Sequence, residues 1–308
     1  MNKNIISVNN LTKQYGQSTA VKNISFNVMQ GDFFGFLGPN GAGKTTTVKM
    51  LTGLTSLSSG NIQIFDKDIN KNAKFIKKKI GVVEDVSNLF PDLTVLENIL
   101  FKSMIFGLPQ KKIKKEILEY LEMFNLTDKL KVKFMKLSRG QKRIVSIISA
   151  LLHSPDILFL DEPTLGLDIN SRNKIHQLLE HLHKKEITIF LTSHYFEEVE
   201  KLCNRINVIN HGNIIFDGDI HKLKSLFPGD KIISIEFANS IADKNLSDYF
   251  VHYKIKNNKL FITCDDVTGI LAQIDKFVKA AQNTIVEINT EGNKLEDLFL
   301  RLVKQDEK

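Results

Sequence analysis

The glycine-rich segment at residues 38–45 constrains the fold of this chain more than any other part of its sequence. It reads Gly-Pro-Asn-Gly-Ala-Gly-Lys-Thr and matches the phosphate-loop pattern G-x-x-x-x-G-K-[ST]. An apolar, strand-like run at residues 33–37 precedes it, and residues 45–54 have helical character, with Gly53 as a stop signal. In this context the glycines let consecutive N–H groups face one anion at the positive end of a helix. We expect an α/β domain that binds nucleotide phosphates here, rather than a glycine-rich turn that binds nothing.

The residues of this loop have separate expected roles. Lys44 would reach the β- and γ-phosphates, and the hydroxyl of Thr45 would ligate Mg²⁺. The other contacts to the nucleotide are expected from Gly38, Pro39, Asn40, Gly41, Ala42, Gly43 and Thr46. A nucleoside triphosphate with Mg²⁺ is therefore the expected ligand.

A second motif lies at the end of another apolar run. Residues 157–160 read Ile-Leu-Phe-Leu and predict a buried parallel strand, directly followed by Asp161 and Glu162. Ligands of open α/β sheets bind at the carboxyl ends of the strands. Asp161 could hold Mg²⁺ through water, and Glu162 could take a proton from an attacking water. Alone, the pair could simply cap the next helix; beside a phosphate loop, it indicates nucleotide hydrolysis.

The apolar runs along the chain alternate between strand-like and helix-like patterns, as in α/β domains. Between residues 91 and 152 the pattern becomes helical, and Thr94 and Glu97 form a capping box that opens a helix. We interpret this part as a helical subdomain inserted into an α/β domain that covers residues 1–224. Strands of that domain are expected at residues 6–8, 20–28, 33–37, 62–65, 157–160, 188–191, 206–209 and 214–217.

A different pattern begins after about residue 226, where Pro-Gly-Asp at 228–230 interrupts the chain. We expect residues 225–308 to form a small α+β domain. Its strands are expected at residues 233–237, 260–264 and 285–288, and its helices at 270–281 and 295–302.

The composition excludes several classes of protein. The 308 residues carry a net charge of +7, and no apolar run approaches the ~20 residues that span a bilayer, which excludes a membrane-spanning subunit. The first residues contain no signal-peptide core, so we expect a cytosolic chain. Lysine clusters within 74–79 and 111–115 favour solvated helix faces over a lipid or nucleic-acid surface. Three histidines of one predicted helix are expected on the surface, namely His176, His181 and His183.

Five motifs in order make residues 1 to about 220 resemble the ATP-binding subunits of ABC transporters. Besides the phosphate loop, residues 161–168 are similar to the family's Walker B and D-loop motifs. Residues 137–141, Leu-Ser-Arg-Gly-Gln, resemble the family's LSGGQ segment with an arginine in place of the first glycine. His194, which ends the tripeptide Thr-Ser-His, is similar to the switch histidine. Tyr15 matches the aromatic residue that stacks on adenine.

This resemblance implies a P-loop NTPase core with an antiparallel β subdomain and a helical subdomain. It implies hydrolysis by Lys44, Glu162 and His194, with Glu162 as the base and His194 as the switch. It further implies that the Ser138 segment faces the γ-phosphate bound by a second copy, through Ser138, Gly140 and Gln141. Taken singly, that segment would be an ordinary helix cap, His194 a structural histidine, and Tyr15 a core or edge aromatic.

One motif departs from the family's pattern. The family places a glutamine after the strand that residues 80–83 resemble, where it touches Mg²⁺ and the membrane subunit. In this sequence the position falls on Asp85, with Glu84 as the neighbouring alternative. A carboxylate can approach Mg²⁺ through water, so we expect Thr45, Asp161 and Asp85 at the metal.

The resemblance also implies a mechanism and partners. Two copies, or this chain and a homologous ATPase, would close around two Mg·ATP and reopen on hydrolysis. This motion would drive a separate integral membrane permease, which would hold the chain at the cytoplasmic face of the cell membrane. Residues 295–300 resemble the ending of ATPases of drug, lipid and polysaccharide exporters, which favours export. No nucleic-acid partner is expected.

Two other classes compete with this interpretation. A soluble ABC ATPase that moves no solute would be associated with ribosomes or DNA repair. Ribosome-associated members usually carry two cassettes and repair members carry long coiled coils, whereas this chain has one cassette and no sustained heptads. A regulator without turnover would lack Glu162 or Lys44, and both are present.

Overall fold

The computed structural model describes residues 3–226, 231–239, 243–256, 259–264, 266–291 and 295–306. The chain folds into two compact units, Met1–Ile220 and His221–Lys308. No helix within these described ranges combines the length and the apolar character that crossing a membrane requires.

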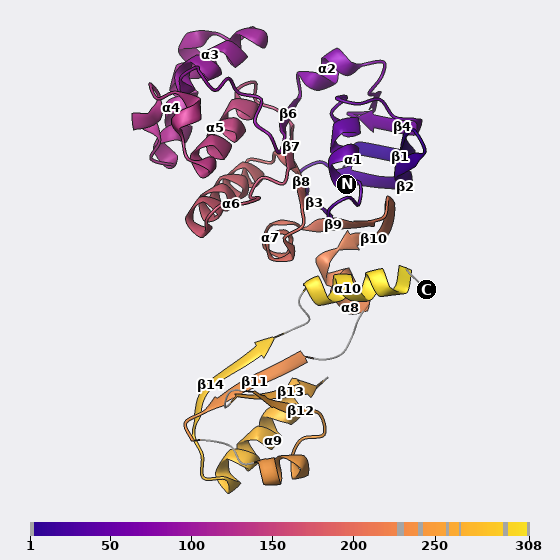
Figure 1. The fold of residues 1–308 in the computed structure, drawn as a ribbon, viewed down its shortest axis with the longest axis vertical. Coiled ribbons are helices and arrows are strands. Elements are labelled where there is room, and N and C mark those ends of the chain that lie inside the picture. Colours follow the sequence, from indigo (N-terminus) through magenta and orange to yellow (C-terminus); the bar gives the residue numbers. More distant parts are fainter. Residues whose placement is uncertain are drawn as a thin grey trace. The chain divides into compact units, whose positions relative to one another are not determined.

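A six-stranded sheet forms the centre of the first unit (Figure 1). Its order is β10-β9-β3-β8-β7-β6, and all neighbours are parallel except β10, which pairs antiparallel with β9. Every residue of β3 (Phe33–Leu37), β7 (Ile157–Asp161) and β8 (Thr188–Ser193) is buried. Strands covered on both faces are predominantly apolar, which explains the apolar runs in the sequence. The other strands are β6 (Ile80–Val83), β9 (Arg205–Asn210) and β10 (Asn213–Asp219).

Helix α1 (Lys44–Leu51) lies between the central sheet and a second, antiparallel sheet (Figure 1). Its Val48, Met50 and Leu51 share one hydrophobic core with apolar side chains of both sheets. The helix ends at Thr52, and Gly53 then adopts a left-handed conformation, φ +67°, that suits glycine. The second sheet has the order β2-β1-β4-β5, with β1 (Asn4–Tyr15), β2 (Ser18–Met29), β4 (Ser59–Ile64) and β5 (Lys67–Asp68). A short helix, α2 (Ala73–Lys77), precedes β6.

Three helices form the expected helical subdomain: α3 (Val95–Ile105), α4 (Gln110–Met123) and α5 (Arg139–Leu151). The predicted capping box is confirmed, because Thr94 Oγ1 accepts from the N–H of Glu97 and Glu97 Oε2 accepts from the N–H of Thr94. Two 3₁₀ turns, Thr127–Lys129 and Phe134–Lys136, connect α4 to α5. Two further helices, α6 (Ile169–Lys184) and α7 (Phe196–Leu202), follow β7 and β8.

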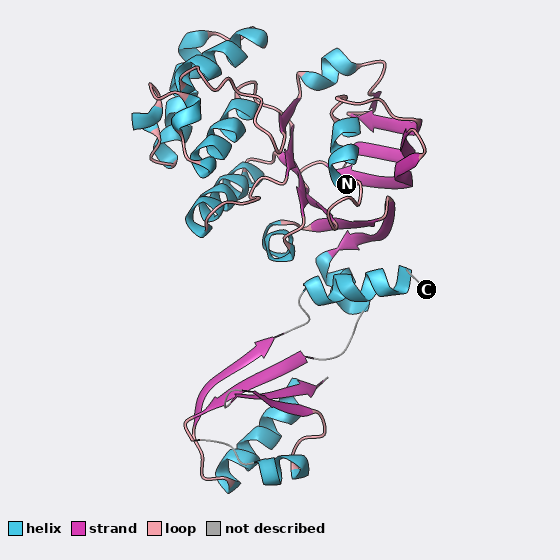
Figure 2. Cartoon of the chain, viewed as in Figure 1, coloured by secondary structure: helices cyan, strands magenta, loops and turns pink. Residues whose placement is uncertain are grey.

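The second unit is an antiparallel sheet with a helix on one face (Figure 2). The order is β12-β13-β11-β14, with β11 (Lys231–Phe237), β12 (Tyr253–Lys256), β13 (Lys259–Cys264) and β14 (Ile285–Glu291). Ile274 and Phe277 of α9 (Val267–Ala280) pack on Ile233 and Ile262 of the sheet. Strand β12 was not predicted, because it is an edge strand whose sequence Tyr-Lys-Ile-Lys stays largely exposed. The remaining helices are α8 (Ile220–Leu226), which crosses the boundary between the units, and α10 (Leu295–Asp306), and residues 243–248 form a 3₁₀ helix.

Candidate active site

Segments far apart in the sequence meet at one edge of the central sheet. Strands β3, β8 and β7 are parallel neighbours, so their carboxyl ends lie together. The phosphate loop follows β3, Glu162 follows β7, and His194 follows β8. The sheet therefore brings Lys44, Glu162 and His194 into one cluster, although each comes from a different motif.

The phosphate loop requires glycine for steric reasons. Gly43 has φ +112°, and a Cβ there would lie 2.6 Å from the carbonyl oxygen of Ala20. A Cβ at Gly38 would lie 2.2 Å from the carbonyl oxygen of Ile209. Gly43 is the N-cap of α1 and offers no side-chain acceptor to the first N–H groups of the helix, which suits an anion in that place. The loop borders a cavity of about 250 Å³, lined by Ala20, Asn40, Gly41, Gly43, Lys44, Thr45, Thr46, Asp85, Glu162 and Leu165.

A buried cation and a buried carboxylate face each other in this cavity. Lys44 Nζ donates to the carbonyl oxygens of Gly38 (2.8 Å) and Pro39 (3.1 Å) and lies 3.2 Å from Glu162 Oε1. The other oxygen, Oε2, accepts a hydrogen bond from Nδ1 of His194 at 2.7 Å. The Glu162 carboxylate is thus held between a lysine and a histidine. Apart from this ion pair with Lys44, Oε1 accepts no hydrogen bond from any described residue.

The backbone of Glu162 is strained. Its φ of +47° lies in the left-handed region, which is uncommon for residues other than glycine. Its N–H donates to Thr192, at 3.0 Å from Oγ1 and 3.2 Å from the carbonyl oxygen. The same Thr192 hydroxyl donates to Asp161 Oδ1 at 2.6 Å. Strand β8 therefore fixes both members of the acidic pair.

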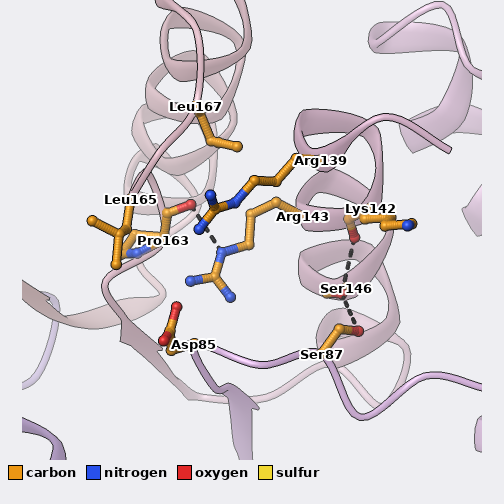
Figure 3. A pocket seen from close by; sticks show the side chains of 9 residues that line it. All are labelled: Asp85, Ser87, Arg139, Lys142, Arg143, Ser146, Pro163, Leu165 and Leu167. Atoms are coloured by element: carbon orange, nitrogen blue, oxygen red, sulfur yellow. Dashed lines mark hydrogen bonds between the residues drawn. The ribbon is translucent and has the colours of Figure 1, made fainter. Parts of the chain in front are cut away.

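Arg143 is a residue of this site that the sequence analysis did not single out. It extends from α5 and is 8% exposed. Its guanidinium donates to the carbonyl oxygens of Asp161 (2.8 Å), Glu162 (2.7 Å) and Pro163 (2.9 Å), and to that of Glu84. Figure 3 shows its side chain reaching from the helix to the Pro163 segment. An arginine only two residues after the predicted Ser138–Gln141 segment was the one signal available in the sequence.

The structure distinguishes between the two acidic residues after β6. Asp85 lines the cavity at the phosphate loop and also a second cavity, of about 140 Å³, beside Arg139 and Arg143 (Figure 3). Glu84 instead raises the pKa of Lys102 on α3, although burial of Lys102 outweighs this and lowers its pKa to about 8. Asp85, not Glu84, is therefore placed toward the phosphate loop.

The Ser138 segment forms the start of α5 and lies away from this cavity. Ser138 Oγ accepts from the N–H of Gln141 (3.2 Å), and Gln141 Oε1 accepts from the N–H of Ser138 (3.0 Å). A Cβ at Gly140 would lie 2.2 Å from Ser171 Oγ, so only glycine fits. Arg139 packs on Gly166, which has φ +65°. Ser138, Gly140 and Gln141 are absent from the cavity lining at the phosphate loop, so the structure does not bring them to that loop within one chain.

Tyr15 lies at the end of β1 and is half exposed. Lys13 Nζ lies 4.9 Å from its ring centroid. Tyr15 is also absent from the lining of the cavity at the phosphate loop.

The surface position predicted for His176 is wrong. His176 is 5% exposed, and its Nε2 lies 3.0 Å from Glu198 Oε1. Glu198 also accepts from the hydroxyls of Thr164 (3.0 Å) and Ser193 (2.8 Å). A polar side chain can be buried when such partners satisfy it, and helical spacing alone does not reveal partners on other elements. His183 is also partly buried, and its Nε2–H donates to the carbonyl oxygen of Gly31 (2.9 Å).

This arrangement defines a phosphate-loop nucleotide hydrolase, and comparisons with known proteins narrow that class. Residues 21–165 match the family model described as ABC transporter. The linearmycin resistance ATP-binding protein of Bacillus subtilis is 43% identical over 231 residues, which are 75% of this chain and 74% of that protein. The Nod factor export ATP-binding protein I of Burkholderia orbicola is 36% identical over 98% of this chain and 97% of its own length. The bacitracin transport ATP-binding protein of Bacillus licheniformis is 35% identical over 97% of each chain.

Solved structures agree with these relatives. The ATP-binding subunit of an ABC transporter aligns with a TM-score of 0.67 and 25% identity over 72% of this chain and 93% of its own. A dimeric, post-hydrolysis ATP-binding cassette with ADP and phosphate aligns with a TM-score of 0.64 and 29% identity over 70% of this chain and 98% of its own. The chain belongs to the ABC transporter family. It is an ATP-binding subunit with the α/β cassette fold, and its activity is ATP hydrolysis.

Proposed function

We propose that Glu162 is the general base of ATP hydrolysis, that His194 holds it in position, and that Lys44 binds the β- and γ-phosphates. The observation that carries this proposal is the position of the Glu162 carboxylate, 3.2 Å from Lys44 Nζ and 2.7 Å from His194 Nδ1. A base must lie within hydrogen-bond reach of its water, next to the group that binds the scissile phosphate. The exposed ring of Tyr15 would stack on the adenine base.

The site also offers oxygen ligands that fit Mg²⁺. Asp161 is 3% exposed and forms no ion pair with any described lysine, arginine or histidine. A buried carboxylate of this kind is suited to pair with a cation. Thr45 and Asp85 add oxygen atoms at the neighbouring cavity. We assign Mg²⁺ to Thr45, Asp161 and Asp85, directly or through water, where it would neutralise charge on the phosphates when bound.

A second copy of the chain, or a homologous ATPase, would complete each site. Ser138, Gly140 and Gln141 lie at a helix start, where backbone N–H groups favour an anion. They do not line the phosphate-loop cavity of their own chain, so a γ-phosphate held by a partner is their expected ligand. The dimeric cassette among the similar structures supports this assembly.

The dimer would power a separate membrane permease and export its substrate, from the cytoplasmic face of the membrane. Relatives similar over nearly their whole length are described as Nod factor export and bacitracin transport proteins, which favours this over a non-transport ATPase. Exposed apolar side chains on α3 and in the segment between β6 and α3 would contact the permease. Phe90 and Phe101 stand edge to face, 5.1 Å apart, at 49% and 40% exposure, and Val86 is 80% exposed. Exposed apolar side chains such as the Phe90–Phe101 pair often contact another protein.

Glu162→Gln tests the base. The amide keeps the volume but cannot take the proton, so the hydrolysis rate should fall by about 100-fold or more while ATP still binds. The variant should then form an ATP-dependent dimer that elutes earlier in gel filtration. Glu197→Gln, at the exposed start of α7, serves as the matched control. Wild-type turnover by Glu162→Gln would refute the assignment.

A further inference from the structure

The guanidinium of Arg143 holds backbone, not a carboxylate. Its three nitrogen atoms donate to four carbonyl oxygens: Nε to Pro163, Nη1 to Glu84, and Nη2 to both Asp161 and Glu162. Three of these acceptors are consecutive residues around the proposed base. The fourth is the carbonyl just before Asp85. One side chain of α5 thus reaches the end of β7 and the loop after β6 together (Figure 3).

The segment that Arg143 holds needs support. Glu162 has a left-handed φ of +47°, a conformation that persists only where the surroundings enforce it. On one side, the N–H of Glu162 donates to Thr192 of β8. On the other side, the carbonyl oxygen of Glu162 accepts from Arg143. With both peptide groups fixed, the side chain points to Lys44 and His194.

We propose that Arg143 is a positioning residue. Through it, the direction of the Glu162 carboxylate depends on the position of α5 relative to the end of β7. Ser138 caps the start of helix α5, so this helix links the segment assigned to a second copy's ATP with the base of its own site. If α5 shifts relative to β7, the carbonyl contacts break and the Glu162 carboxylate loses its fixed direction. The same guanidinium holds the loop at Glu84 and Asp85, so a shift of α5 would release that loop as well. This inference rests on the proposed role of Glu162.

Lysine cannot replace arginine here. Its ammonium is a single nitrogen with three N–H groups, whereas the four carbonyl oxygens are reached from three separate nitrogens of the planar guanidinium. Arg143→Lys keeps the charge and most of the volume, but it must lose at least one contact. Arg143→Gln also removes the charge and can donate from only one nitrogen.

The first experiment separates catalysis from binding. In Arg143→Lys we expect kcat for ATP to fall about tenfold or more, while KM and the Kd for a fluorescent ADP analogue change less than about twofold. Lys142→Met, one residue earlier on α5, removes a charge without touching the carbonyl cluster and should keep wild-type kcat. If Arg143→Gln unfolds, Arg143→Lys decides the question. An unchanged kcat in a folded Arg143→Lys, or a loss confined to KM, would overturn the proposal.

The second experiment asks whether Arg143 acts through Glu162. In single-turnover hydrolysis, Arg143→Lys should have no further effect on the residual rate of Glu162→Gln, because residues that act through one another are not additive. A purely structural role would multiply the two losses, and that result would also overturn the proposal. If Glu162→Gln alone keeps the wild-type rate, the base assignment fails independently of Arg143.

Discussion

Replacement of Glu198 by alanine should destabilise the first unit by about 4 kcal/mol. The carboxylate is 3% exposed and accepts from Thr164 Oγ1 (3.0 Å) and Ser193 Oγ (2.8 Å), and it pairs with His176 Nε2 (3.0 Å). All three partners are buried, so alanine would leave them without an acceptor. Each of the three buried groups left unpaired costs about 1–3 kcal/mol, and values near the lower end of this range give a total of about 4 kcal/mol.

The loss should be measurable as a shift in melting temperature. For a unit of this size, 1 kcal/mol corresponds to about 2–4 °C, so Glu198→Ala should lower Tm by about 8–16 °C. Glu198→Gln keeps one acceptor oxygen and should lower Tm by less than half as much. Differential scanning calorimetry of the whole chain gives the value, and the transition of the first unit is the one that Mg·ATP raises.

The control for this prediction lies on the same helix. Glu197 is exposed in the first turn of α7, where an acidic side chain contributes less than about 1 kcal/mol. Glu197→Ala should therefore shift Tm by only a few degrees. If Glu198→Ala shifts Tm no more than Glu197→Ala does, the hydrogen bonds of the Glu198 carboxylate to α6 and to the end of β8 do not stabilise the first unit.

Two further predictions concern binding and pH. Lys44→Ala should weaken ATP binding by about 100-fold or more in equilibrium dialysis, because two charge-assisted phosphate contacts are lost. As a control, Lys49→Ala, at an exposed position of the same helix, should bind ATP normally. Retained ATP binding by Lys44→Ala would contradict the phosphate-loop assignment. Burial lowers the pKa of His153 below its usual value, so protonation favours the unfolded chain, and stability should decline as pH falls from about 6.5 through the lowered pKa. His153→Gln should reduce this decline in melts at several pH values, and an unchanged pH dependence would show that another group causes it.

Local signals in the sequence were sufficient to predict the structure of a segment where that structure depends mainly on the segment's own residues. The apolar runs in β3, β7 and β8 predicted buried strands, because a strand covered on both faces is predominantly apolar. Thr94 and Glu97 predicted a helix start because a capping box involves only four consecutive residues. The spacing of glycine and lysine in the phosphate loop likewise specified a loop conformation and its ligand class.

The missed features depend on partners distant in the sequence. His176 looked like a surface residue because Glu198, its partner, lies 22 residues away on another helix. The edge strand β12 lacks an apolar pattern, because pairing with β13 rather than burial stabilises it. Asp85, in contrast, was already the expected residue from its spacing, and the structure adds that it lines the cavity at the phosphate loop.

The sequence by itself determined the chemistry of this protein: a phosphate loop, an acidic pair after an apolar strand, and a histidine after the next strand. Each of these is a short segment whose residues act locally. The tertiary structure decided how they cooperate. It placed Glu162 between Lys44 and His194, and it held the strained backbone of Glu162 with an arginine from another subdomain. The physical reason is that hydrogen bonds and ion pairs act over about 3 Å, and only the folded sheet brings residues from separate motifs to that distance.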